Sequence, residues 1–81
     1  MSLDTILQKV NTIFIDVLDN DDIQLQAATT AKDIDGWDSL SHIQLIHAIE
    51  KGFKVRFNTA EIIKWKNVGE ICEAIEKHQA K

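Results

Sequence analysis

The sequence has little cysteine and no long apolar run, and both absences exclude whole classes of protein. A single cysteine among 81 residues cannot form an internal disulfide or a cysteine-based zinc site, which fits a reducing compartment. No segment has the basic and then apolar form of a signal peptide, and no run approaches the length of a membrane-spanning helix. We therefore expect a cytoplasmic protein without membrane insertion.

Basic residues are also too few to give the chain a positive charge. The net charge is −4, with a balance of −6 over residues 1–38 and +2 over residues 39–81. The acidic first part disfavours nucleic acid as a partner. It favours a partner protein with a basic surface.

The hydrophobic pattern predicts an all-α fold in a single domain over residues 1–81. Apolar residues at helical spacing predict a first helix over residues 3–18, with Ser2 as a plausible N-cap. Residues 19–38 show no sustained period and are predicted to form a long loop. Three apolar residues should hold this loop against the core: Ile23, Leu25 and Ile34.

A second helix is predicted from about Ser39 to Lys51, with Gly52 as its stop. On a helical wheel, one broad arc of this helix is apolar and consists of Ile43, Leu45, Ile46, Ile49 and Phe53. The opposite arc is polar and consists of Ser41, Gln44, His47 and Lys51. The segment that follows, over residues 53–57, is predicted to be an extended connector with its aromatic side chains turned inward.

Two pairs of residues at capping-box spacing mark the starts of the last two helices: Asn58 with Glu61, and Asn67 with Glu70. The third helix should be short and end near Trp65, and Cys72 should be an inert member of the apolar stripe of the fourth. The first, second and fourth helices are expected to pack around Leu7, Val10, Phe14, Ile46, Ile49, Ile71 and Ile75.

The most informative stretch is Asp35-Gly36-Trp37-Asp38-Ser39-Leu40. Asp38 is a good N-cap, so Ser39 falls in the first turn of the second helix, with its hydroxyl pointing away from the core. A helix N-terminus offers unpaired N–H groups and a partial positive charge, both of which suit a phosphate. The sequence therefore predicts an exposed hydroxyl where a phosphoester would be stabilised.

This stretch, together with the apolar residues spaced after it, resembles the acyl carrier proteins. Asp38-Ser39-Leu40 matches the family's Asp-Ser-Leu motif, whose serine carries 4′-phosphopantetheine, and the resemblance covers roughly residues 3 to 77. It implies a four-helix bundle with a short third helix and a long loop between the first two. It also implies that acyl groups are held as thioesters on an arm at Ser39, beside Trp37, Asp38 and Leu40.

The resemblance further implies partner enzymes and the residues that meet them. The enzymes are a phosphopantetheinyl transferase (holo-carrier synthase), a ligase that loads acyl or aminoacyl groups, and a ketosynthase or acyltransferase, and we expect them to act on a monomer. The partner-facing residues are expected to be Asp35, Asp38, Leu40, Ile43, Gln44, His47 and Glu50.

One departure from the family bears on the pathway. Carriers of fatty acid synthesis have a strongly acidic second helix, whereas the matching positions here are Ser41, Gln44, Glu50 and Lys51. A dedicated polyketide, specialised-lipid or surface-modification pathway is therefore at least as well supported as fatty acid synthesis.

Other functions fit the sequence less well. An aminoacyl or peptidyl carrier is the nearest alternative, and a helical interaction module without a prosthetic group would show the same amphipathic pattern. A hydrolase built on Asp38, Ser39 and His42 is disfavoured, because the nucleophile elbow is absent and a small helical domain should offer little pocket. The aspartate clusters lack the glycine and glutamate of a calcium loop, so neither a catalytic residue nor a metal site is expected.

Overall fold

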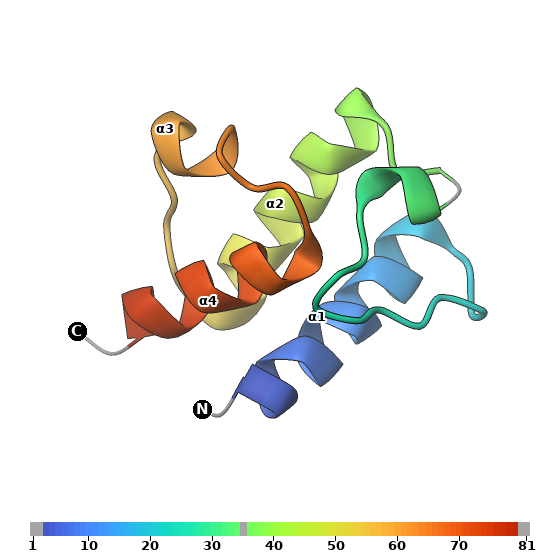
Figure 1. Ribbon diagram of the computed structural model, residues 1–81, viewed down its shortest axis with the longest axis horizontal. Coiled ribbons are helices and arrows are strands. Elements are labelled where there is room, and N and C mark those ends of the chain that lie inside the picture. The colour runs from blue at the N-terminus through green and yellow to red at the C-terminus, as the bar shows by residue number, and fades with distance from the viewer. Residues whose placement is uncertain (1–2, 35, 80–81) are drawn as a thin grey trace.

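A computed structural model describes residues 3–34 and 36–79, and its three long helices lie side by side with a short helix beyond them (Figure 1). The elements are α1 (Leu3–Leu18), the 3-10 helix η1 (Ala31–Asp33), α2 (Ser39–Phe53), α3 (Thr59–Ile62) and α4 (Val68–Gln79). This confirms the predicted all-α fold with a short third helix and a long loop after the first. The described residues contain no strand, and the predicted cap Ser2 lies outside them.

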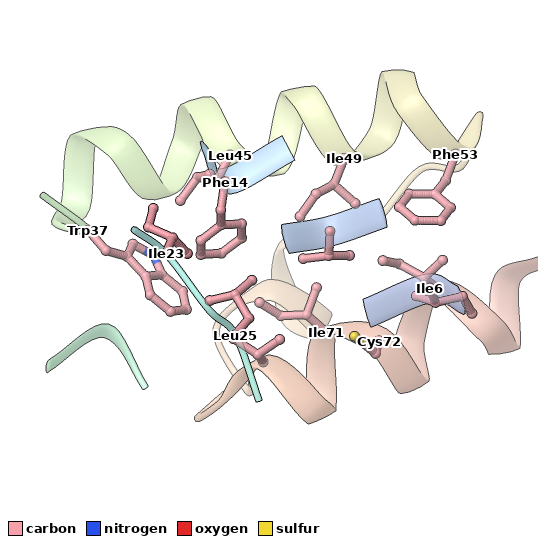
Figure 2. Packing of buried hydrophobic residues seen from close by; sticks show 13 residues of the cluster. Ile6, Phe14, Ile23, Leu25, Trp37, Leu45, Ile49, Phe53, Ile71 and Cys72 are labelled. Carbon is pink, nitrogen blue, oxygen red and sulfur yellow. The ribbon is translucent and has the colours of Figure 1, made fainter. Parts of the chain in front are cut away.

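The core lies between α1, α2 and α4. Helix α1 packs against both of the others, and its residues Ile6, Val10 and Phe14 are completely buried. Figure 2 shows Phe14 below Leu45 of α2 and Ile6 near Cys72 of α4. The remaining buried residues that were predicted for the core are Ile46, Ile49, Ile71 and Ile75. Leu7, which was also predicted there, is only partly buried at the edge of the cluster.

Polar contacts hold the long loop in place as well as apolar ones. Ile23 and Leu25 are buried as predicted, and Ile34 is partly buried. Between them, Asn11 of α1 donates from Nδ2 to the carbonyl of Ile23 at 3.2 Å and accepts the N–H of Leu25 on Oδ1 at 2.7 Å. The amide of Gly69 donates to the carbonyl of Ala27 at 2.8 Å, which ties the loop to the start of α4.

Helix α2 does not stop at Gly52 but continues to Phe53. The buried side chain of Phe53, which is 5% exposed, keeps the last turn against the core. Lys54 then adopts the left-handed conformation, with φ 57°, and its N–H bonds to the carbonyl of Glu50. Gly52 instead lies close to Ile13, whose Cδ1 would be 3.2 Å from an added Cβ.

The connection from α3 to α4 also differs from its prediction. Helix α3 ends at Ile62 rather than near Trp65, although its capping box of Asn58 and Glu61 is present as predicted. Beyond it, Trp65 packs edge-on against Phe57, with ring centroids 4.9 Å apart. The carboxylate of Glu61 pairs with the imidazole of His78 at 2.9 Å, which joins α3 to α4.

Cys72 is buried in the apolar face of α4, with 3% of its surface exposed. Burial raises the pKa of its thiol to about 11, in agreement with the predicted inert role. No helix in the described ranges combines the length and the apolar character that a membrane span requires. Within the same residues, no group of three or more His, Cys, Asp or Glu side chains is placed to hold a metal ion.

Candidate functional site

The site begins at the N-cap of α2. Asp38 has the extended backbone of a cap, and its Oδ1 accepts hydrogen bonds from the N–H groups of Leu40 at 3.1 Å and Ser41 at 2.9 Å. These bonds hold the pKa of the Asp38 carboxyl below its ordinary value, and the bond from the Ser41 backbone N–H has the largest effect. The predicted cap is therefore confirmed, and it carries a negative charge beside Ser39.

Ser41 locks the turn that leads into the helix. Its hydroxyl donates to the carbonyl of Gly36 at 2.6 Å and accepts the N–H of Asp38 at 2.8 Å, so Asp38 and Ser41 form a reciprocal capping box. Gly36 has φ 88°, a conformation that favours glycine. Ser41 is only 8% exposed, so its assignment to the outward polar arc was wrong. The three-residue spacing from Asp38 is the signal that could have revealed this role.

Ser39 is the first residue of α2 and is exposed. Its hydroxyl makes no hydrogen bond to any residue that the structure describes, so it is available for chemistry. The Asp38 carboxylate occupies the N–H groups of Leu40 and Ser41. The helix N-terminus therefore presents the hydroxyl, but these two N–H groups are not free to hold a phosphate.

Trp37 anchors the loop beneath the site. It is 9% exposed, and its ring lies edge-on to Phe14 of α1 with centroids 4.9 Å apart. Its indole N–H donates to Nδ1 of His42 at 3.0 Å. His42 is half-buried at the edge of the core, and this burial lowers its pKa. Because Nδ1 accepts this bond, the neutral imidazole carries its proton on Nε2 and cannot accept a proton there. No hydrogen bond joins His42 to Ser39 among the described residues, so the pair that a hydrolase would need is not formed.

An open cleft of about 430 Å³ lies beside Ser39, where little pocket was expected. Residues from three parts of the chain line it: Ala31 of η1, then Trp37, Asp38, Ser39 and His42 around the start of α2, and Trp65, Lys66, Asn67 and Ile71 around the start of α4. The sequence did not predict this cleft because its far wall is the segment before α4, which is distant along the chain. Its walls combine apolar rings with one cation, Lys66, and one carboxylate, Asp38.

The comparisons with known proteins agree with this geometry. Residues 8–75 match the family model described as the phosphopantetheine attachment site. The chain belongs to this family of acyl carrier proteins. No curated protein matched the sequence. Among solved structures, the carrier is similar to a holo acyl carrier protein from Geobacter metallireducens, with 43% identity, a TM-score of 0.86, and coverage of 91% of this chain and 85% of that one.

The outward face of α2 in the carrier is mostly uncharged at its Ser39 end. Leu40 is 70% exposed and Ile43 is 57% exposed. Ile43 was assigned to the buried arc of the helix, and that part of the prediction was wrong. Its exposure agrees with its other assignment as a partner-facing residue, although contact with a partner stays a prediction. The exposed polar side chains on this face include Gln44 and His47.

The acidic partner-facing candidates are less available than their sequence positions suggest. Glu50 is half-buried, and its carboxylate accepts the N–H of Phe57 at 2.9 Å. Asp35 lies outside the described residues. Asp38 is exposed, but its Oδ1 is engaged in capping α2. The carrier thus presents few free carboxylates along α2.

Proposed function

We propose that Ser39 carries the phosphopantetheine arm, and that the carrier delivers acyl groups to the enzymes of a dedicated pathway. In this proposal the protein is a monomeric, non-catalytic carrier in the cytoplasm. The observation that carries it is the exposed Ser39 hydroxyl, which has no hydrogen-bond partner among the described residues and lies between Asp38 and Leu40 of the Asp-Ser-Leu motif.

The residues around Ser39 fit such an arm. The hydroxyl opens beside the cleft of about 430 Å³, and the rings of Trp37 and Trp65 line that cleft. Lys66, which also lines it, supplies a positive charge for a phosphodiester and offsets the Asp38 carboxylate in the same lining. Asp38 keeps the first turn of α2 formed, and so keeps the hydroxyl turned outward.

Attachment requires a separate transferase. The Ser39 oxygen would attack the phosphorus that bears pantetheine in coenzyme A, the pyrophosphate bond would break, and adenosine bisphosphate would leave. A base of the transferase would take the hydroxyl proton, since His42 is engaged with Trp37. When bound, the arm supplies a thiol on which acyl groups are held as thioesters and brought to successive enzymes at high effective concentration.

The surface of α2 supports a pathway other than fatty acid synthesis. Partners with a basic patch need acids on this helix, but Gln44 and Lys51 are exposed where two of those acids would be. The single acid, Glu50, is engaged with the backbone of Phe57. We therefore propose a ligase and a ketosynthase or acyltransferase that serve a polyketide or specialised lipid.

Intact mass spectrometry tests the attachment. Incubation with coenzyme A and a broad-specificity transferase should add one phosphopantetheine, and peptide mapping should place it on Ser39. Ser39→Ala should fold normally and gain nothing, whereas the matched surface variant Gln8→Ala, on α1, should gain the same mass as the parent. An unchanged parent mass with several transferases would instead favour the interaction module without a prosthetic group.

A transfer assay tests the pathway. The holo protein should be a poor substrate for a ketosynthase of fatty acid synthesis, and the double variant Gln44→Glu with Lys51→Glu should be a better one at low salt. Each exposed ion pair contributes up to about 1 kcal/mol, so two pairs correspond to a gain of up to about thirtyfold. Added salt should reduce this gain. Equal rates for both proteins at low salt would show that this surface does not select the pathway.

A further inference from the structure

A second surface feature lies at the end of α2 opposite Ser39. There the last turn of the helix and the connector that follows it form an open groove of about 670 Å³. Its lining consists of His47, Glu50, Lys51, Lys54, Val55 and Arg56. In Figure 1 this end of α2 lies near α4, well away from the end of α2 that follows the long loop. The groove is therefore separate from the attachment site.

The groove is positively charged although the protein is acidic. Three cations, Lys51, Lys54 and Arg56, and one carboxylate, Glu50, give its lining a net charge of +2 in a chain of net charge −4. All three cations are exposed, and none forms an ion pair with any residue that the structure describes. The carboxylate of Glu50 is engaged with the N–H of Phe57. The positive charges thus have no internal partner.

The backbone places one of these cations at some cost in stability. Lys54 occupies the left-handed position at the C-terminus of α2, where glycine is the favoured residue. The neighbouring Lys9 lies over the ring of Phe53, with Nζ 4.8 Å from the centroid, and adds a further positive charge at this end of the helix. A basic side chain therefore stands where a glycine would be less strained.

We propose that this basic groove docks an acidic patch on a folded partner protein, namely an enzyme that acts on the loaded carrier. The proposal rests on the proposed carrier function and extends it by naming the charge of the partner. Unpaired cations in an open groove attract carboxylates over a Debye length of about 10 Å. The same cations repel the basic patch of an enzyme that recognises an acidic helix, which would add specificity against it.

The overall charge favours a protein over other polyanions as the occupant. Nucleic acids and anionic membranes present continuous negative charge, which the acidic remainder of the chain, with a balance of −6 over residues 1–38, would repel. A local acidic patch on a folded protein can meet the groove without approaching those residues.

The test is an NMR titration of the full-length carrier with defined probes. The first probe is a helical peptide with glutamate pairs spaced i, i+4, and its control is the same peptide with glutamine at those positions. The glutamate peptide should shift the amide signals of residues 47–57, and the glutamine peptide should not. Raising the salt from about 50 mM to about 300 mM should weaken this binding.

Matched variants separate the groove from the general charge of the protein. The triple variant Lys51→Gln, Lys54→Gly and Arg56→Gln removes three positive charges from the groove, and should lose affinity for the glutamate peptide on the order of tenfold. The control variant removes three exposed positive charges elsewhere on the protein, with the substitutions Lys32→Gln, Lys64→Gln and Lys77→Gln. Its affinity for the glutamate peptide should differ from that of the parent by less than about twofold. An equal loss in both would overturn the proposal.

Competing probes and the Ser39→Ala variant complete the test. The same titration is repeated with vesicles of phosphatidylcholine and phosphatidylglycerol and with a DNA duplex. If either bound the groove more tightly than the glutamate peptide, the proposal that its occupant is a protein would be wrong. Ser39→Ala should bind the glutamate peptide like the parent, and the groove variant should still gain phosphopantetheine. A failure of docking is therefore distinguishable from a failure of the attachment at Ser39.

Discussion

Replacing Ser41 by alanine should both destabilise the carrier and slow the modification of Ser39, although the attachment hydroxyl is retained. The Ser41 hydroxyl donates to the carbonyl of Gly36 at 2.6 Å and accepts the N–H of Asp38 at 2.8 Å. Alanine can make neither bond. The turn that presents Ser39 would lose the two hydrogen bonds that hold it, and the first turn of α2 would fray more often.

The magnitude follows from the burial of this hydroxyl. A buried polar group left without its partner costs about 1–3 kcal/mol. Ser41 is 8% exposed, but Gly36 and Asp38 lie at the surface, where water can replace part of what is lost. We therefore expect a loss of about 2 kcal/mol for the two bonds together. In a domain of this size that corresponds to a fall in Tm of about 8–16 °C.

Urea unfolding followed by circular dichroism measures the stability, and intact mass measures the rate of phosphopantetheine transfer. The midpoint should fall with the slope m unchanged. The matched control is Ser39→Ala, which removes an exposed hydroxyl and should change stability by no more than about 0.5 kcal/mol while abolishing transfer. If Ser41→Ala unfolded at the parent midpoint and accepted the arm at the parent rate, this account of the capping box would be wrong.

Three other outcomes are expected. Ile49→Ala removes a completely buried side chain and should cost about 2–5 kcal/mol, with much of the helical circular dichroism lost; a shift of only a degree or two would contradict the phase of α2. Burial lowers the pKa of His42 below its ordinary value of 6.5. The contribution of neutral His42 to the free energy of unfolding should therefore be complete above pH 6.5 and decline as the pH falls from 6.5 through the folded-state pKa. An NMR titration of His42 above pH 6.5 would refute this sign. Lys54→Gly should raise Tm, because φ 57° at Lys54 favours glycine by about 1 kcal/mol, and a lower Tm would refute that reason.

Local patterns were enough to predict most of the fold. The apolar period of α1 and the caps at Asp38 and Asn58 depend only on neighbouring residues, and the structure contains all three. The outward position of Ser39 followed from the cap. The stop at Gly52 was wrong because burial of Phe53 in the tertiary structure outweighs the tendency of glycine to end a helix.

The positions of Ser41 and Ile43 on α2 were wrong because the apolar arc of the helical wheel was taken to be too broad. At about 100° per residue, Ser41 lies only about 40° from the buried Leu45, whereas Ile43 lies about 60° beyond Ile46. Polarity placed Ser41 outside and Ile43 inside, but the geometry places them the other way. The cleft beside Ser39 could not be predicted because Trp65 and Lys66 reach it through tertiary packing.

The burial of Cys72 has a practical consequence for measuring the loaded state. A thiol reacts as its thiolate, and a pKa of about 11 leaves Cys72 almost wholly protonated near neutral pH. An exposed thiol with the ordinary pKa of 9.0 would be ionised on the order of a hundred times more often. Alkylating reagents applied to the native protein should therefore label the free arm and spare Cys72. Labelling of the native protein would then count the free arms, and the added labelling after denaturation would count Cys72 once per chain. The ratio of the two gives the fraction of chains with a free arm, without any need to replace the cysteine.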